Sequence, residues 1–191
     1  MIILIIMMNR GGGVMKTNET AQAAVGEQDF RDLMAGVCAP VTVVTATENG
    51  TPHGATVSAF ASLSLRPPMV SVALDRTSRL LARIQRTGRF AVNVLGAGQQ
   101  ALALRFARHA ADRFAGIRWE YEHALPRLHG APGRLVCELA SVAEGGDHLL
   151  LLGAVVHART RTAAPLVYGH RAFGTHSAFT ADEQPTAAPL R

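Results

Sequence analysis

The sequence predicts a mainly β domain with helical insertions, in which an antiparallel barrel is favoured over a doubly wound parallel sheet. Three observations support this prediction. Two pairs of extended apolar runs are each joined by a short turn sequence, at residues 48–51 and 144–147. Segments with helical periodicity do not alternate regularly with the extended runs. The 191 residues, 48% of them hydrophobic, suit one domain with a single core.

The domain is expected to begin with a short amphipathic helix. Its apolar stripe has the spacing i, i+3, i+4 and i+7 and consists of Phe30, Leu33, Met34 and Val37. Asp29 is the candidate N-cap, and Pro40 is expected to end the helix. We expect residues 1–26 and 180–191 to be flexible, so that the domain spans 27–179.

Two β-hairpins are predicted. The β-branched run 41–47 is followed by Asn49 and Gly50, the dipeptide most typical of a tight hairpin turn. In the second half, residues 134–143 and the long apolar run 148–160 flank a second glycine-containing turn. Four further elements are predicted by periodicity: strands at 69–74 and 90–95, and helices at 78–87 and 99–107.

Residues 56–65 alternate almost strictly in polarity, which predicts one continuous strand. Its apolar face carries Val57, Ala59, Ala61, Leu63 and Leu65. Its other face is mostly hydroxyl and carries Thr56, Ser58, Phe60, Ser62 and Ser64. A hydroxyl face of this kind fits either a ligand site or the solvent side of an antiparallel sheet, and the pattern leaves both interpretations open.

Disulfide, metal and membrane sites are not expected. Cys38 and Cys137 form no C-x-x-C pair, and the eight histidines show no metal-ligand spacing. The apolar run 1–8 is far below the ~20 residues needed to cross a bilayer, and it lacks the features of a signal peptide. A protein of the reducing cytoplasm is the simplest expectation.

A glycine-rich sequence at 96–101 fits the pattern G-x-G-x-x-A between a predicted strand and a predicted helix. A dinucleotide-binding βαβ unit would then need a parallel strand with an acidic ribose ligand within about 30 residues. Arg113, Phe114 and Trp119 stand there instead. We therefore interpret the glycines as an ordinary strand-to-helix loop.

Positive charge is concentrated in residues 75–118, named here the basic segment, which hold nine arginines against Asp75 and Asp112. Such a segment fits the phosphates of a dinucleotide, a nucleic acid, or two solvated helices. Nucleic acid is disfavoured because no aromatic residues are interleaved with the charges. His148, just after Gly146 and Asp147, is the histidine we single out, although an ordinary turn histidine has the same spacing.

An ordered series of short motifs resembles the short-chain flavin reductases, the NAD(P)H:flavin oxidoreductase components of two-component flavin-dependent monooxygenases. The resemblance spans about residues 29–174. The motifs are Phe30-Arg31-Asp32, Val41-Thr42-Val43-Val44-Thr45, Gly54-Ala55-Thr56-Val57-Ser58-Ala59-Phe60, Ser62-Leu63-Ser64, Pro67-Pro68, Phe90-Ala91-Val92-Asn93-Val94-Leu95, Phe106-Ala107, Arg113-Phe114 and Gly146-Asp147-His148.

The resemblance implies a flavin-binding split β-barrel of Greek-key type that acts as a homodimer. It implies hydride transfer from NADH, with NADPH disfavoured, to FMN or FAD. The reduced flavin, FMNH2 or FADH2, would pass to a separate flavin-dependent monooxygenase, and the resemblance suggests a role in natural-product biosynthesis. No nucleic-acid or membrane partner is expected.

The resemblance also implies roles for individual residues. His148 would lie near the nicotinamide and is the candidate catalytic residue. Pro40 and Ala55 depart from the family pattern, which more often has a glycine and a larger apolar residue there. The candidate flavin-binding residues fall in three groups: Thr56, Val57, Ser58 and Ser62 along the hydroxyl-rich stretch, Asp75, Arg76, Thr77 and Ser78 in one loop, and Phe106 with Arg113 near the ribityl and phosphate.

Two other hypotheses stay open at this stage. The chain could bind flavin without turnover, as a carrier or electron-transfer partner, which predicts tight flavin retention and no NADH consumption. It could also be a basic nucleic-acid-binding module, which predicts salt-dependent binding that flavin does not compete away.

Overall fold

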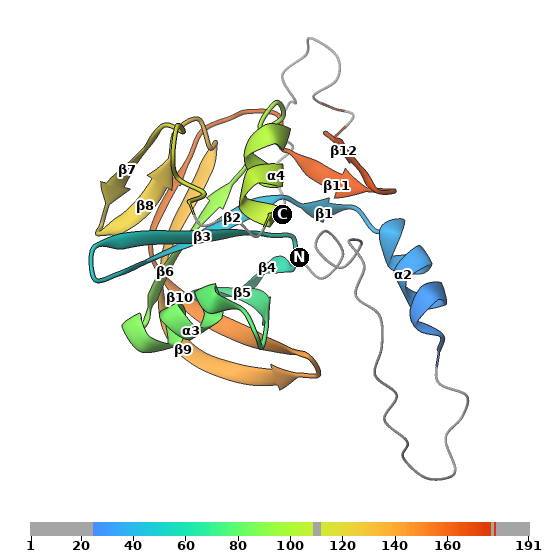
Figure 1. Ribbon diagram of the computed structural model, residues 1–191, viewed down its shortest axis with the longest axis horizontal. Helices are drawn as coiled ribbons and strands as arrows, with labels where there is room; N and C mark the ends of the chain where they lie inside the picture. The colour runs from blue at the N-terminus through green and yellow to red at the C-terminus, as the bar shows by residue number, and fades with distance from the viewer. Residues whose placement is uncertain (1–24, 109–111, 177, 179–191) are drawn as a thin grey trace.

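The structure, a computed structural model, describes residues 25–108, 112–176 and 178 (Figure 1). The C-terminal segment expected to be flexible, 180–191, lies outside the described residues, as does nearly all of the N-terminal one. The helices are α2 (Glu27–Ala35), α3 (Arg79–Thr87) and α4 (Gln100–Ala107). The strands are β1 (Ala39–Pro40), β2 (Thr42–Glu48), β3 (Thr51–Val57), β4 (Phe60–Leu65), β5 (Pro68–Asp75), β6 (Arg89–Val94), β7 (Trp119–Glu122), β8 (Leu125–Leu128), β9 (Gly133–Gly145), β10 (His148–Thr160), β11 (Val167–Gly169) and β12 (Ala172–Gly174).

Most of the strands form one antiparallel sheet, in the order β3-β2-β6-β9-β10-β5-β4. This confirms the prediction of a mainly β protein with helical insertions. Because β6 pairs with β9 in antiparallel fashion, the glycines at 96–101 open no parallel βαβ unit. Here Gly96 instead forms an isolated bridge with Pro165, as an ordinary loop residue.

Both predicted hairpins are present. Asn49 and Gly50 have φ of 51° and 73°, which is the left-handed backbone that a tight two-residue turn between β2 and β3 requires. The second turn lies between β9 and β10, where Gly146 has φ of 68° and Gly145 pairs with His148. In each case a residue that tolerates positive φ sits where the chain must reverse.

The prediction of one strand over residues 56–65 is wrong. Here β3 ends at Val57 and β4 begins at Phe60, and the two strands lie at opposite edges of the sheet order. Two-residue alternation continues across the break, so it could not reveal that the chain changes partners at Ser58 and Ala59. Consequently the hydroxyl residues do not share one face: Thr56 belongs to one edge strand and Ser62 to the other.

The connection between β3 and β4 forces the sheet to curl. Seven strands laid flat would separate the two edges by about 29 Å, because neighbouring strands lie about 4.8 Å apart. The three steps from Val57 to Phe60 span only about 11 Å. The ends of β3 and β4 therefore meet, and the amide of Ala73 in β5 donates to the carbonyl of Ala59 at 3.0 Å.

Two helices flank the first hairpin and divide the core. Both α3 and α4 contact β2 and β3, and Figure 1 shows them on opposite sides of this hairpin. The larger core cluster includes Leu80, Leu81 and Ile84 of α3, which lies within the helix predicted at 78–87. The second cluster surrounds Phe106 of α4 and the loop residue Phe114. Ser78 caps α3 by accepting a hydrogen bond from the amide of Leu81 at 3.4 Å.

The first helix differs from the prediction. It begins at Glu27 with Gly26 as N-cap, so Asp29 lies inside the first turn and does not cap it. The helix is attached to the C-terminal strands, since Asp32 pairs with Arg171. Its apolar stripe is not buried within the chain: the exposed fractions are 53% for Phe30 and 68% for Leu33. None of the helices in the described part is long and apolar enough to cross a membrane.

Two small sheets were missed by the sequence reasoning. Here β7 and β8 form a separate hairpin, and β1, β11 and β12 form a three-stranded sheet. The β7–β8 turn contains His123 and Ala124, both with positive φ and neither a typical turn residue for that conformation. The strands of these sheets have two to four residues, which is too short for a periodic pattern.

The two cysteines should differ sharply in reactivity. Cys137 is fully buried in β9, and this burial raises the pKa of its thiol to about 12, whereas Cys38 is exposed. At pH 8 only about one Cys137 in ten thousand is then a thiolate, the reactive form. We expect a thiol reagent to modify one cysteine in native protein and two after unfolding. Mass spectrometry of the labelled peptides checks this, and rapid native labelling of a Cys38→Ser variant would contradict it.

Candidate functional site

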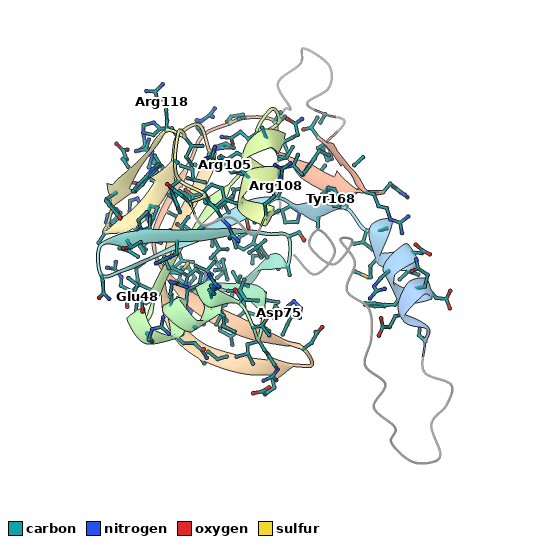
Figure 2. The ribbon with its side chains drawn as sticks, viewed as in Figure 1. Glu48, Asp75, Arg105, Arg108, Arg118 and Tyr168 are labelled. Carbon is teal, nitrogen blue, oxygen red and sulfur yellow. The ribbon has the colours of Figure 1, made fainter. Side chains whose placement is uncertain are left out.

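The basic segment does not form one continuous patch. Arg86 of α3 donates two hydrogen bonds to Glu48 on the first hairpin, at 2.5 and 3.0 Å, and Arg83 lies 3.4 Å from the same carboxylate. Figure 2 shows Glu48 and Asp75 on the side of α3. The same figure shows three other arginines of the segment on the side of α4: Arg105, Arg108 and Arg118.

The loop Asp75–Ser78, named here the 75–78 loop, joins β5 to α3 and is stabilised from within. Asp75 Oδ1 accepts hydrogen bonds from the backbone N–H and the hydroxyl of Thr77, both at 2.6 Å. Partial burial raises the pKa of Asp75, but the two hydrogen bonds from Thr77 and the nearby His148 outweigh it, so the pKa lies below its usual value. Asp75 is therefore an ionised structural residue of the loop, and its Oδ1 is engaged.

His148 stands directly beside the 75–78 loop. It is the first residue of β10 and pairs across the sheet with Asp75. Its side chain is almost completely buried, and Nδ1 lies 2.7 Å from Oδ1 of the exposed Asp147. This contact engages Nδ1, so a ligand that binds the ring would do so at Nε2.

A second group of predicted residues gathers on β3. Arg113 Nη1 donates to the carbonyl of Gly54 at 2.5 Å, and the ring of Phe106 lies against the same glycine. Arg105 Nε in turn donates to the carbonyl of Arg113 at 2.8 Å. Phe106 is completely buried, so it can shape this region through Gly54, with its ring packed inside the second core cluster.

An unsatisfied arginine connects the two groups. Arg113 is half-buried, and among the described residues its Nε is buried without a hydrogen-bond partner. Burial lowers the pKa of Arg113, and the positive charge of Arg79, in the first turn of α3, lowers it further. Two neighbouring guanidinium groups and an unpaired nitrogen are an arrangement that a bound anion would stabilise. The residues present therefore fit a phosphate between α3 and β3.

The remaining predicted residues occupy different surroundings. Thr56 is completely buried and donates its hydroxyl proton to the carbonyl of Ala103 in α4, at 2.6 Å. Val57 is also completely buried, Ser58 is half-buried at the break between strands, and Ser62 is exposed on β4. Any donor that Thr56 offers to a ligand would thus come from its backbone.

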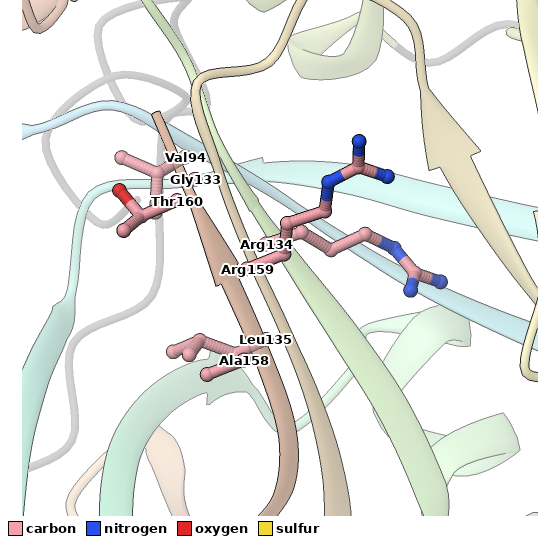
Figure 3. Close-up of a pocket in the computed structure, with 7 residues that line it drawn as sticks. All are labelled: Val94, Gly133, Arg134, Leu135, Ala158, Arg159 and Thr160. Atoms are coloured by element: carbon pink, nitrogen blue, oxygen red, sulfur yellow. The ribbon is translucent and has the colours of Figure 1, made fainter. Parts of the chain in front are cut away.

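A separate recess of about 250 Å³ lies over the ends of the central strands β6, β9 and β10. Figure 3 shows that the guanidinium groups of Arg134 and Arg159 point to the opposite side from Val94 and Thr160. Arg134 is instead held by Glu122, at 2.8 Å. The recess shares no residue with the predicted site. Within the described residues there is also no group of three or more His, Cys, Asp or Glu that could hold a metal ion.

Four residues that the sequence reasoning did not assign belong to this region. The sequence places Gly54 within a longer motif and Arg79 among the nine arginines of the basic segment, and neither pattern assigns the residue a role of its own. Asp147 and Glu144 are acidic residues of a turn, which is where charged residues are common in any protein. Only the sheet register places them beside the 75–78 loop. Arg76, predicted to bind the flavin, pairs instead with Glu144 in this structure.

A curled antiparallel sheet with two arginines beside its edge strand is an arrangement that suits a small β domain with a phosphate-bearing ligand. Comparison with known proteins makes this specific, because residues 34–177 match the Flavin reductase like domain family. The chain therefore belongs to the flavin reductase family, as the resemblance implied. Membership makes the chain a flavin-reducing oxidoreductase, and relatives include NADH-dependent flavin reductases and the reductase component of a monooxygenase.

Individual relatives agree with this assignment. The chain is 41% identical over 164 residues to an NADH:riboflavin 5′-phosphate oxidoreductase of Streptomyces pristinaespiralis, covering 83% of this chain and 93% of the relative. It is 38% identical to the reductase component of a 4-nitrophenol and 4-nitrocatechol monooxygenase of Rhodococcus opacus, covering 76% and 79%. An NADH:FAD oxidoreductase of Streptomyces globisporus, solved with NAD and FAD fragments, superposes with a TM-score of 0.78 at 29% identity, covering 86% and 100%.

Gly54 should not tolerate a side chain. A Cβ atom there would lie 2.9 Å from Cε1 of Phe106 and 3.2 Å from Cγ2 of Thr45. We expect Gly54→Ala to lower the free energy of unfolding by about 1–3 kcal/mol through overpacking, and to shift the carbonyl that Arg113 contacts. Urea unfolding measures the effect. Gly174→Ala is the matched control, because its Cβ would meet nothing closer than 4.0 Å. Equal stability of the two variants would contradict the expectation.

Proposed function

We propose that this enzyme binds FMN or FAD as an exchangeable substrate between β3, the 75–78 loop and α3. The observation that supports this location most directly is Arg113, whose buried Nε has no partner in the described part of the chain, together with the nearby positive charge of Arg79. Both flavins carry a phosphate on the ribityl chain, so the same arginines serve either one. The N-terminus of α3, which Ser78 caps, lies at the same place and adds the positive end of a helix dipole.

The reaction needs orientation more than it needs an acid or a base. A bound flavin supplies N5 as the hydride acceptor, and NADH supplies the hydride from C4 of its nicotinamide. The backbone of Thr56, Val57 and Ser58 would hold the polar edge of the ring, where N–H groups stabilise the negative charge of the reduced state. His148 would orient the nicotinamide through Nε2 while Asp147 holds Nδ1. Ser62 stays a prediction, as the exposed serine of β4.

Turnover with free flavin tests this proposal. Purified protein is freed of flavin by gel filtration and then assayed for NADH oxidation with added FMN or FAD, each over a range of concentrations. We expect saturation in both substrates and little flavin retained through gel filtration, with NADPH a poorer donor. Tight retention of one flavin would show a bound prosthetic group and overturn the exchange proposal. Transfer of the reduced flavin to a separate monooxygenase is checked by coupled oxygenation through a dialysis membrane.

We also propose that the enzyme is a cytoplasmic homodimer built on a split β-barrel. The meeting of β3 and β4 supports closure of the sheet, and the exposed stripe of α2 supports a partner copy that covers it. The two cysteines, with no disulfide between them, suit a reducing compartment. Sedimentation velocity tests the dimer. We expect twice the monomer mass for the native chain and a shift toward monomer for Leu33→Asp, while a native monomer would overturn the proposal.

A further inference from the structure

Arg76 connects the 75–78 loop, to which it belongs, with the turn that precedes His148. Arg76 Nε donates to the carbonyl of Gly146 at 2.7 Å, and its guanidinium also pairs with Glu144. The backbone N–H of Arg76 donates to the carbonyl of Asp147 at 3.1 Å. Arg76 therefore contacts three of the four residues that precede His148.

The turn needs such a contact because its own sequence does not make it rigid. Gly145 and Gly146 have no side chains to pack, and Gly146 adopts a positive φ. The Asp147 side chain is exposed, so its contact with His148 depends on where the turn backbone lies. A guanidinium bound to both a carbonyl and a carboxylate holds a backbone more firmly than a neutral hydrogen bond does.

These contacts also engage the charge that was expected to meet the flavin. The Nε of Arg76 is bound to a backbone carbonyl, and its guanidinium is paired with a carboxylate. Arg79, one turn further on, has no ion pair within the described residues, and its positive charge lowers the pKa of Arg113. Arg76 is thus bound to the turn that precedes His148, whereas the Arg79 side chain has no ion pair in the described part of the chain.

We propose that Arg76 is a positioning residue for the nicotinamide and takes no part in binding the flavin phosphate. It holds the Gly145–His148 turn in register with the 75–78 loop, so that the Asp147–His148 pair is in place before NADH arrives. This proposal rests on the proposed role of His148 in orienting the nicotinamide. It replaces the expectation, drawn from the family resemblance, that Arg76 contacts flavin.

Arg76→Ala is the direct test, with Arg86→Ala as the matched control. Both arginines belong to the basic segment, pair with a glutamate and have similar exposure, 44% for Arg76 and 56% for Arg86. We expect Arg76→Ala to raise the KM for NADH and the Kd for NAD⁺ about tenfold, the usual size for losing a charge-assisted hydrogen bond. The Kd for FMN should stay within about twofold. Arg86→Ala should leave all three constants unchanged.

Calorimetric titration with NAD⁺ makes the test independent of turnover, and thermal unfolding shows whether the variant is folded. Glu144→Gln removes the ion pair while keeping an acceptor, so we expect a smaller change in the same direction. Equal losses of FMN and NAD⁺ affinity, or a loss confined to FMN, would overturn the proposal. So would unchanged NAD⁺ affinity in a folded Arg76→Ala variant.

A double-mutant cycle separates this inference from the role of His148. If Arg76 acts through His148, Arg76→Ala should change NAD⁺ affinity little when added to His148→Ala. If His148→Ala alone leaves NAD⁺ affinity intact, the proposed role of His148 fails, and the inference that depends on it fails too. If His148→Ala weakens NAD⁺ binding while Arg76→Ala adds its full effect to it, the role of His148 stands and the inference about Arg76 is wrong.

Discussion

Replacing Arg113 by alanine should weaken FMN binding by about 10- to 100-fold while changing the affinity for riboflavin only slightly. Hydrogen bonds to charged groups contribute about 1.5–3 kcal/mol, and each 1.4 kcal/mol corresponds to a factor of ten. Arg113 is half-buried, and within the described residues its Nε has no partner, so its charge is poorly screened and available to a phosphate. Riboflavin lacks that phosphate and should not gain from it.

The comparison of the two flavins is needed because Arg113 has a second role. It also donates to the carbonyl of Gly54 on β3, so its removal disturbs the strand that would hold the ring. That disturbance affects FMN and riboflavin equally, whereas the loss of a phosphate contact affects FMN alone. Fluorescence titrations with both flavins at two salt concentrations measure the difference.

Two further variants make the interpretation of Arg113 sharper. Arg79→Ala should also weaken FMN binding selectively, since its charge lies close enough to lower the pKa of Arg113. Arg118→Ala, at an exposed arginine of the same basic segment, should change neither affinity. Equal losses of FMN and riboflavin affinity in Arg113→Ala would mean that this arginine only supports β3, and the phosphate would have to bind elsewhere.

The parts of this fold that could be predicted are those in which a local residue preference agrees with the tertiary structure. Asn49 and Gly50 predicted their turn because few residues adopt positive φ twice in succession. Leu80, Leu81 and Ile84 predicted α3 because the spacing of a helix's buried residues is a local property. The conformation of such elements is determined by their own residues, and the structure confirms both the turn and the helix.

The predictions that failed concern features that depend on which segments of the chain become neighbours. The alternation through residues 56–65 is the same before and after the break, although β3 and β4 pair with β2 and β5 at opposite ends of the sheet order. Phe30, Leu33 and Met34 lie on α2 as predicted, but the helix ends at Ala35, before Val37 and well before Pro40. Phe30 and Leu33 of this stripe stay exposed, and nothing in the described part of the chain covers them. Periodicity predicts that a face is apolar, but it does not identify the partner of that face.

The candidate site also combines features that the sequence could predict with features that depend on tertiary neighbours. The family resemblance placed the 75–78 loop and His148 in one site, and the register of β5 with β10 makes them direct neighbours. It also assigned Arg76 to the flavin, which no spacing argument could test, because Arg76 and Arg79 lie only three residues apart. The register decides which of the two reaches the Gly145–His148 turn, and it favours Arg76.

His148→Ala should raise the KM for NADH or lower kcat by about tenfold or more, with the Kd for FMN within about twofold of the native value. The expected size follows from the loss of one oriented contact to the nicotinamide, since reactive geometry is lost steeply when a reactant is misplaced. Flavin affinity should change little because the groups proposed to hold the ring and the phosphate, which are the β3 backbone and the arginines Arg79 and Arg113, do not include His148. Stopped-flow reduction of FMN at saturating NADH separates the hydride step from binding.

Two companion variants distinguish a ligand contact from support of the fold, because His148 is almost completely buried. Asp147→Asn keeps a hydrogen-bonding group beside Nδ1, so it should lower NADH affinity less than His148→Ala does. His148→Gln fills more of the space and should recover stability without recovering the KM for NADH. If alanine instead weakens NADH and FMN equally, and glutamine restores both together, His148 supports the β10 turn as a whole and does not orient the nicotinamide.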